Sequence, residues 1–446
     1  MKTLLAVLLV AAIAAHAEDG YDLWLRYRPI AGESLGEYRQ AASEIVPSAP
    51  SPTLDIAQSE LTRGLSGLLG VNEPISAQPT RNGSVIFGTP RSSPLIAKLG
   101  LPLDRVGAEG YVVRSVDYEG HHVTVIAANN DVGVLYGAFH LGPLFEETLR
   151  SDTYARGKDS TVARVIDGSL FGYNNTGMAG VANIGSDRNW TASHFDQANW
   201  YVFGRLAWNP TLSSRDIAED WVKMTFSADP TFVAPVVSMM MGSREAAVDY
   251  MTPLGLHHQM ARTSHYGPEP WVSGGARADW TSVYFNRADE QGIGFDRISA
   301  GSDALSQYAQ PVAAQYADLR RIPQKYLLWF HHVPWDYRLA SERTLWDELV
   351  IHYSQGVQTV SDMRKTWAGL AQFVDAEGYA QVSAFLAIQE KEARWWRDAS
   401  IAYFQTFSHR PLPAGYAPPE HDLRYYESLC FPYAPGSASR PSGSCK

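Results

Sequence analysis

Carboxylates stand close to tryptophans at three points between residues 187 and 280; the pairs are Asp187 with Trp190, Glu269 with Trp271, and Asp279 with Trp280. A carboxylate accepts hydrogen bonds from sugar hydroxyls, and the flat face of an indole ring matches the apolar C–H face of a pyranose. Twelve of the thirteen tryptophans follow residue 189. This pattern favours carbohydrate binding, while a place in a helical core is the alternative for each single tryptophan.

Hydrolysis of a glycosidic bond would require two carboxyl groups facing one pocket, with one acting as general acid and the other as base or nucleophile. Glu146 and Glu147 are adjacent, and on a helix their side chains diverge by about 100°. They therefore cannot flank one bond, and we interpret them as a solvated helix face. Glu269 and Asp279 suit hydrogen bonds to sugar, but no spacing marks a catalytic pair. We assign no catalytic residue from the sequence.

Two pairs of neighbouring histidines, His257-His258 and His331-His332, are the other candidates for chemistry. Adjacent residues do not share a helix face, so neither pair has the spacing of a helical metal site. The sequence contains no HExxH or phosphate-loop pattern. We therefore predict no metal site and no cofactor.

Residues 1–17 have the features of a signal peptide. Lys2 supplies a positive charge, residues 4–14 are apolar, and Ala15-His16-Ala17 matches the small-x-small site that signal peptidase cleaves. The apolar run is too short to span about 30 Å of hydrocarbon. We expect export to the periplasm or the extracellular medium, and a mature chain that begins at Glu18.

Charge and cysteine content limit the partners. The formal net charge is −10 and the basic residues are not clustered, which argues against nucleic acid and anionic membrane surfaces as partners. No later stretch approaches the roughly twenty apolar residues of a transmembrane helix. The two cysteines, Cys430 and Cys445, could form one local disulfide in an oxidising compartment but could not cross-link the fold.

Hydrophobic patterning predicts a small N-terminal α/β domain over residues 18–141. Its expected elements are a strand at 21–25, a helix at 56–69, a strand at 85–87, a hairpin formed by 111–116 and 123–127, and a helix that starts at 131. Residues 142–170 form a short bridge with one or two helical turns at 144–149, followed by a polar segment.

From residue 171 to 410 the chain is predicted to be mainly helical. The expected helices are 217–226 behind a capping box of Ser213 and Asp216, 343–353, and 381–407, whose apolar stripe is interrupted by Glu392. The loop from His257 to Trp280 is rich in glycine, proline, histidine and aromatic residues. Residues 411–446 are proline-rich and expected to be an extended tail.

Five segments form a distinctive set: Gly180-Val-Ala-Asn-Ile-Gly-Ser-Asp-Arg-Asn-Trp190, Leu256-His-His-Gln-Met260, His265-Tyr-Gly-Pro-Glu-Pro-Trp271, Ala278-Asp-Trp-Thr281 and Tyr326-Leu-Leu-Trp-Phe-His-His-Val-Pro-Trp335. Together they resemble the bacterial α-glucuronidases of glycoside hydrolase family 67. The resemblance covers nearly all of residues 142–436. Residues 18–27 and 133–140 are similar to the N-terminal domain of that family.

The resemblance implies an N-terminal α/β domain, a central (β/α)8 barrel that holds the active site, and a helical C-terminal domain that mediates dimerisation. It also implies metal-free, inverting removal of glucuronic acid from xylo-oligosaccharides. A barrel needs about 250 residues, whereas residues 141–147 already resemble the late part of the family's barrel. The predicted fold is therefore α+β multidomain, with residues 142–170 as a barrel remnant after a join near Leu141 and a mainly helical C-terminal domain at 171–410.

The family's catalytic carboxylates lie in the part that this chain lacks, so the resemblance assigns none here. It does place His265, Trp271, Asp279 and Trp280 in loops that face substrate, with packing between domains as the alternative. We expect an α-glucuronidase by lineage that does not hydrolyse glucuronic-acid-substituted xylo-oligosaccharides. The alternatives are a non-catalytic protein that binds xylan or forms a homodimer through residues 343–408, and a gene sequence joined in error.

Overall fold

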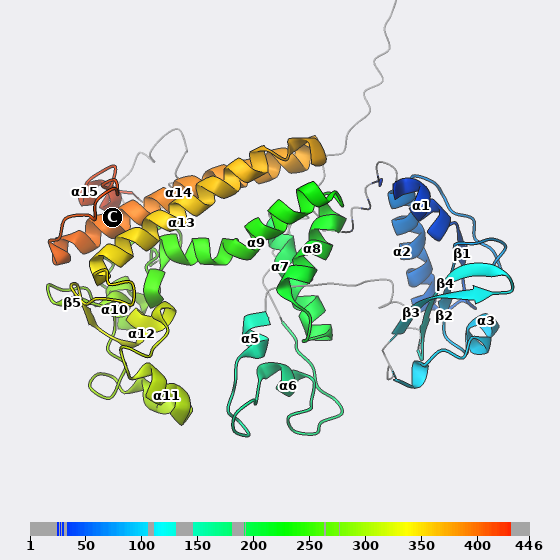
Figure 1. Cartoon of the computed structure of the whole chain (residues 1–446), viewed down its shortest axis with the longest axis horizontal. Coiled ribbons are helices and arrows are strands. Elements are labelled where there is room, and N and C mark those ends of the chain that lie inside the picture. Colours follow the sequence, from blue (N-terminus) through cyan, green and yellow to red (C-terminus); the bar gives the residue numbers. More distant parts are fainter. Residues whose placement is uncertain are drawn as a thin grey trace, which may run out of the picture. The chain divides into compact units, whose positions relative to one another are not determined.

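The computed structural model describes residues 34–105, 111–130, 146–180, 193–262, 265–275 and 277–429, together with positions 25, 27, 29, 30 and 191. It divides into two compact units, which are described separately (Figure 1). Several predicted features lie outside the described residues: the signal peptide, residues 21–24 of the expected strand at 21–25, the expected helix from 131, the join near Leu141, the Asp187–Trp190 pair and both cysteines.

A four-stranded mixed sheet organises the first unit. Its strands are β1 (Glu44–Val46), β2 (Ser84–Gly88), β3 (Tyr111–Tyr118) and β4 (His121–Ala128), in the order β1-β2-β4-β3. The strands β1, β2 and β4 are parallel, and β3 runs antiparallel to β4 with Tyr118 opposite His121. The predicted hairpin and the predicted strand at 85–87 are thus confirmed, while the sequence pattern missed the short strand β1.

Helices cover both faces of this sheet (Figure 1). The helix α2 (Pro52–Leu69) packs Leu54 and Ala57 against Phe87 and Ile126 on one face. On the other face, α3 (Pro94–Lys98) packs against the alternate residues of the same strands. A short helix α1 (Ser34–Ala41) precedes β1. Because side chains alternate between the faces of a strand, the buried strands supply two apolar clusters at once.

The second unit is mainly helical. Its longer helices are α7 (His194–Trp208), α8 (Ser214–Thr225), α9 (Pro230–Met251), α13 (Leu345–Ala368) and α14 (Ala376–Ser408). The shorter elements are α10 (Ser282–Asn286), α11 (Gln310–Tyr316), α12 (Leu327–Phe330), α15 (Leu423–Glu427) and the two-residue strands β5 (Gly292–Ile293) and β6 (Val333–Pro334). None of the helices in the described ranges is both long and apolar enough to cross a membrane.

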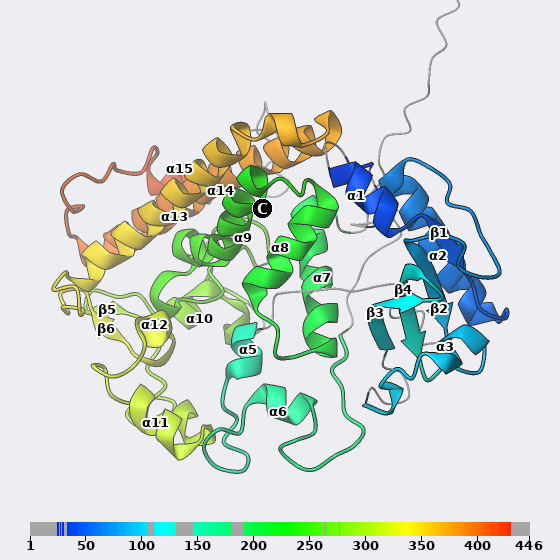
Figure 2. The same ribbon diagram turned by 45° about the vertical axis from the view of Figure 1, so that its right-hand side comes forward.

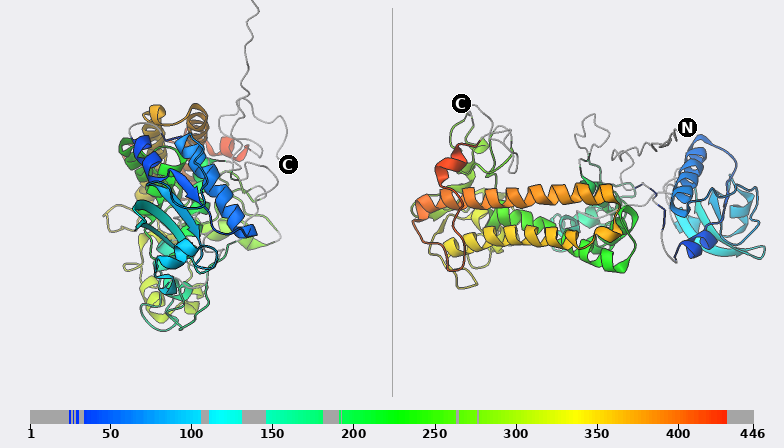
Figure 3. Two further views of the ribbon diagram at one scale, coloured as in Figure 1. Left: turned by 90° about the vertical axis from the view of Figure 1, so that its right-hand side faces the viewer. Right: turned by 90° about the horizontal axis from the view of Figure 1, so that it is seen from above.

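Specific contacts hold the long helices together. The Ser213 hydroxyl accepts the Asp216 amide at 3.2 Å and caps α8, as the sequence predicts. An ion pair between Arg205 and Asp220 (2.8 Å) joins α7 to α8, which lie next to each other in Figure 2. Helices α13 and α14 run side by side in Figure 3, and the Arg364–Glu390 ion pair (2.7 Å) links them.

The bridge between the sheet and the long helices contains α5 (Glu146–Arg150) and α6 (Val162–Ile166). No closed barrel is present among the residues that the structure describes. The coarse expectation of an α+β protein with several parts agrees with this architecture. The interpretation of the bridge as a barrel remnant stays a prediction.

The proline-rich segment after α14 is tied to the helices up to residue 429. The Trp346 indole donates to the Pro411 carbonyl at 2.8 Å. The buried carboxylate of Asp398 accepts from the Glu420 amide at 3.2 Å and from the Tyr426 hydroxyl at 3.3 Å. These bonds anchor the segment, which ends in α15.

Candidate functional site

Two buried amides position the loop between His257 and Trp280. Gln259 and Asn286 are both fully buried. The Asn286 side-chain amide donates to the Gln259 side-chain oxygen at 2.8 Å and to the Pro270 carbonyl at 2.9 Å. The Glu269 amide donates to the Gln259 carbonyl at 2.9 Å. Because buried polar groups are costly unless they are paired, these bonds hold the loop in one conformation.

The same loop is fastened to α14. Gly267 has a φ of 78°, and a Cβ added there would lie 2.1 Å from the ring of Trp395. The Tyr266 hydroxyl donates to the Glu392 carboxylate. This bond explains why an acidic residue interrupts the apolar stripe of α14, which the sequence pattern had left without a reason.

Trp280 is a predicted site residue whose ring is accessible. Its side chain is 53% exposed, and the Arg277 guanidinium lies 5.3 Å from the ring centroid. The same guanidinium donates to the Asp279 carboxylate, with the Arg277 Nε 3.0 Å from Asp279 Oδ1. The hydrogen bonds from Arg277 lower the pKa of Asp279. Arg277, Asp279 and Trp280 thus form an exposed polar and aromatic surface, with an ionised carboxylate that cannot donate a proton at neutral pH.

The other two predicted residues lie in different settings. Trp271 is partly buried and packs against the helical core, with its ring 6.1 Å from that of Tyr403. This contact lies within the helical unit, so it is not the packing between domains that was the alternative. His265 is exposed, has a φ of 54°, and lies with its ring 6.1 Å from that of His258. The structure therefore keeps Asp279 and Trp280 together and gives Trp271 a packing role.

The first two residues of the loop, His257 and His258, belong to a cluster of histidine and aromatic rings. The His257 ring is 5.2 Å from Trp329 and 5.4 Å from Phe285, and the His258 ring is 5.0 Å from Phe285. Burial lowers the pKa of both histidines, and repulsion from neighbouring cations adds to the effect. Within the described ranges, no group of three or more histidine, cysteine or acidic side chains has the arrangement of a metal site.

Glu269 is the second carboxyl group of this loop. It is partly buried, and this burial raises its pKa. A raised pKa suits a general acid. Glycoside hydrolysis, however, also needs a second carboxylate at a fixed separation, and Asp279 is held by Arg277.

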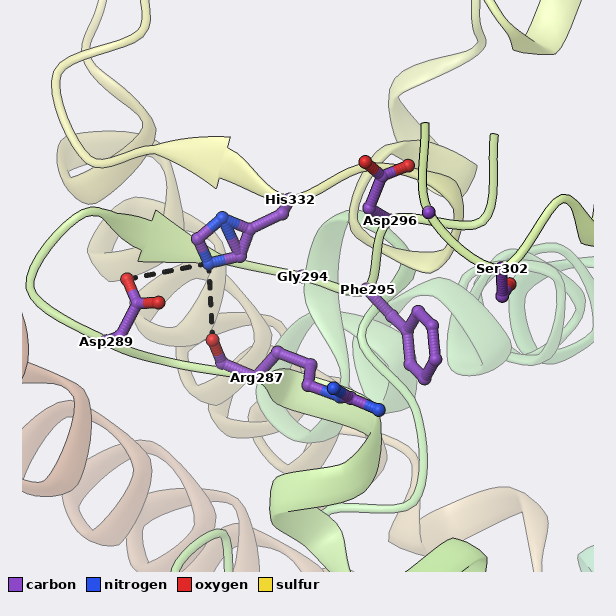
Figure 4. A pocket seen from close by; sticks show the side chains of 8 residues that line it. Arg287, Asp289, Gly294, Phe295, Asp296, Ser302 and His332 are labelled. Carbon is purple, nitrogen blue, oxygen red and sulfur yellow. Dashed lines mark hydrogen bonds and ion pairs between the residues drawn. The ribbon is translucent and has the colours of Figure 1, made fainter. Parts of the chain in front are cut away.

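Figure 4 shows a pocket that the sequence interpretation did not predict. Its volume is about 480 Å³, and its lining residues are Arg287, Asp289, Gly294, Phe295, Asp296, Gly301, Ser302 and His332. His332 Nε2 lies 3.2 Å from the Arg287 carbonyl oxygen and 3.6 Å from Asp289 Oδ1. The lining combines one arginine, two carboxylates and an aromatic ring, so it offers both donors and acceptors to a small polar molecule.

Glu146 and Glu147 hold the bridge segment to the helical unit. Glu146 accepts the Ser214 amide at the start of α8, and its side chain is only 23% exposed. Glu147 pairs with Arg244 at 3.1 Å and also with Lys325. The interpretation as a solvated helix face is therefore wrong for Glu146, because its partner comes from a segment far away in the sequence.

Comparison with protein families gives three consecutive matches. Residues 23–141 match the model described as "Glycosyl hydrolase family 67 N-terminus", residues 123–190 the "middle domain", and residues 191–417 the "C-terminus". The middle-domain match is much shorter than the roughly 250 residues of a (β/α)8 barrel.

Curated relatives cover the larger part of this chain. It is 35% identical over 272 residues to "Probable alpha-glucuronidase A" of Neosartorya fischeri, a match that covers 60% of this chain and 32% of that protein. It is 34% identical over 275 residues to "Alpha-glucuronidase" of Hypocrea jecorina, with 61% and 32% covered. The chain spans about a third of the length of these relatives. The match to the C-terminus model alone covers half of the chain, and the chain therefore belongs to glycosyl hydrolase family 67.

Proposed function

We propose that this chain binds glucuronic-acid-substituted xylo-oligosaccharides through the surface formed by Arg277, Asp279 and Trp280, and that it does not hydrolyse them. The substrate class is supported by the names of the relatives, which are α-glucuronidases. The observation that carries the binding proposal is the exposed indole of Trp280 beside an arginine–aspartate pair.

The chemistry of this surface suits sugar. The exposed face of the indole can stack on the C–H face of a pyranose. The Asp279 carboxylate can accept bonds from ring hydroxyls, and the Arg277 guanidinium can donate to hydroxyl or carboxylate oxygens. Because the two charges pair with each other at the surface, they are oriented before a ligand arrives.

Hydrolysis is not expected because no pair of carboxyl groups in the described part of the chain is held in the required positions. An inverting glycosidase needs its acid and base about 6.5–9.5 Å apart, held to within roughly 0.5 Å. In the family that this chain resembles, a barrel provides that rigidity. The described residues form no closed barrel, and Asp279 is already engaged by Arg277.

Two measurements on the same protein test the proposed binding and the proposed lack of hydrolysis. Incubation with aldotriouronic acid should release no glucuronic acid, while calorimetry with the same oligosaccharide should detect binding. Trp280→Ala should weaken binding about five- to tenfold, which corresponds to the loss of one aromatic stacking contact. Trp208→Ala serves as the matched control because Trp208 is exposed to a similar degree, at 49%. Release of glucuronic acid would refute the non-hydrolytic part, and equal affinities of the two variants would refute the site.

The proposal also includes the localisation and the oligomeric state of the protein. We expect an exported homodimer that forms through residues 343–408, where Phe385 and Ile388 on α14 are 45% and 46% exposed. Light scattering should give twice the monomer mass, and Phe385→Asp should reduce it; a monomer at micromolar concentration would contradict this.

The join near Leu141 can be tested independently. Long-read sequencing that found further coding sequence at this position would show that the gene was joined in error. The non-hydrolytic part of the proposal would then be withdrawn.

A further inference from the structure

Two arginines lie against the ring of Phe295, and one of them, Arg287, lines the pocket in Figure 4. The guanidinium carbon of Arg287 is 4.2 Å from the centroid of Phe295, and that of Arg297 is 4.0 Å from the same centroid. Arg297 also lies 3.8 Å from the centroid of Trp329. Neither arginine forms an ion pair with any residue in the described part of the chain. The wall formed by Arg287 and Phe295 therefore carries a positive charge that no carboxylate in the described ranges pairs with, and the charge of Arg297 lies against the same ring outside the lining.

The charged guanidinium of Arg297 is buried, which is energetically unfavourable. The residue is only 7% exposed, and a buried cation is unfavourable unless something compensates it. Burial lowers the pKa of Arg297 to about 10, and repulsion from Arg287 adds to this shift. Its guanidinium donates to the Trp329 carbonyl, which compensates one of five N–H groups. An anion near this wall would reduce the remaining cost.

Two aspartates of the pocket lining offer acceptors. Asp289 Oδ1 accepts the amides of Gln291 at 2.8 Å and Gly292 at 3.0 Å. Asp296 Oδ1 accepts the Ile298 amide at 3.1 Å. These turns fix both carboxylates, and the second oxygen of each receives no hydrogen bond from the residues that the structure describes. In Figure 4, Asp289 points toward His332 and Asp296 lies away from the Arg287 guanidinium.

We propose that this pocket binds a sugar acid, with the ligand carboxylate on Arg287 and the ligand hydroxyls donating to Asp289 and Asp296. A simple anion would use only Arg287 and would be repelled by the two aspartates. A neutral sugar would leave the charge of Arg287 uncompensated. A molecule with both a carboxylate and hydroxyls can pair with Arg287 and with the aspartates, and the volume of about 480 Å³ is within the usual range for a small-molecule site.

This site is distinct from the one proposed above, because neither Trp280 nor Asp279 is among the lining residues. Its ligand is also different, since a free sugar acid needs no xylose chain. Binding of oligosaccharide at Trp280 and binding of a free sugar acid in the pocket can therefore succeed or fail separately.

Titration calorimetry of the full chain with sodium glucuronate, glucose and inorganic phosphate tests the proposal. Glucuronate should bind, and glucose and phosphate should each bind at least about tenfold more weakly. Arg287→Met should weaken glucuronate binding by about tenfold or more, as expected for the loss of charge-assisted hydrogen bonds. Arg320→Met removes an exposed arginine that does not line the pocket and should leave the affinity unchanged.

Asp296→Asn separates a sugar acid from a simple anion. If Asp296 accepts a hydrogen bond from a ligand hydroxyl, this variant should bind glucuronate more weakly. A site that recognises only the negative charge of the ligand would instead bind glucuronate more tightly, because the repelling charge of Asp296 is gone. Tighter binding by Asp296→Asn, equal binding of phosphate, or an unchanged affinity of Arg287→Met would overturn the proposal. Thermal melting of each variant confirms that it is folded before the affinities are compared.

Discussion

The crossing of α9 and α13 depends on the absence of a side chain at Gly356. A Cβ added at this position would lie 2.5 Å from the Tyr250 amide nitrogen and 2.9 Å from the Ala246 carbonyl oxygen. Both atoms belong to the backbone of α9, so no side chain can turn aside to make room. Gly356→Ala would therefore force the two helices apart by roughly 1 Å at their closest point, since carbon contacts are normally about 3.5–4.0 Å long.

The expected loss of stability follows from two opposing effects. Overpacking of a close helix contact costs about 1–3 kcal/mol. Alanine recovers about 1 kcal/mol of helix propensity relative to glycine. Gly356→Ala should thus lower the free energy of unfolding by up to about 2 kcal/mol.

Gly242→Ala is the matched control for this prediction. Gly242 lies in α9 itself, and an added Cβ would have no neighbour within 4 Å. This variant should gain only the higher helix propensity of alanine, so its free energy of unfolding should rise by up to about 1 kcal/mol. Urea unfolding followed by circular dichroism measures both changes. If Gly356→Ala proved as stable as Gly242→Ala, the close approach of α9 and α13 in this structure would be wrong.

Three further predictions concern ionisable groups. Burial of Glu44 opposes its ionisation, but hydrogen bonds from Ser76, Ser84 and Thr80 lower its pKa to about 2 from 4.5. The contribution of Glu44 to the free energy of unfolding is therefore complete above about pH 4.5 and is lost as the pH falls toward 2. Melting temperatures measured between these pH values should fall less steeply for Glu44→Gln than for the unmodified protein. An equally steep fall would contradict this prediction. The hydrogen bond to Asp249 (2.8 Å) raises the pKa of His352, so this pair stabilises the α9–α13 contact fully below pH 6.5 and less as the pH rises through the folded-state pKa. The melting temperature of His352→Gln should not fall as the pH rises through this range. If it fell as much as that of the unmodified protein, His352 would not be the source of the pH dependence. Asp398→Ala would leave Arg397 without its carboxylate partner and would remove the hydrogen bonds to the Glu420 amide and the Tyr426 hydroxyl. We expect the free energy of unfolding to fall by about 3 kcal/mol and proteolysis after residue 408 to become faster. An unchanged rate of cleavage would show that other contacts hold the segment.

Local patterns were sufficient for several elements. The hairpin of β3 and β4 and the cap of α8 follow from alternation and from a serine three residues before an aspartate, and both appear as predicted. Helix α13 extends from 345 to 368, well beyond the expected 343–353. Val357, Val360, Met363 and Trp367 continue the apolar stripe at helical spacing, so the sequence carried this signal and the prediction ended the helix too early. Helix α9 was not delimited from the sequence, since Pro235 lies inside it and apolar residues occur on all its sides.

The sequence by itself determined the family, the helical character of the second half and the loop in which a candidate site lies. Only the tertiary structure separated Trp280, which is exposed, from Trp271, which packs on Tyr403, because local sequence does not specify what covers a side chain. The same holds for Glu146, whose partner Ser214 lies 68 residues away. The pocket was equally hidden, because His332 reaches Arg287 and Asp289 only when β5 and β6 pair. Burial and long-range pairing arise from the packing of distant segments, and no local pattern of residues encodes them.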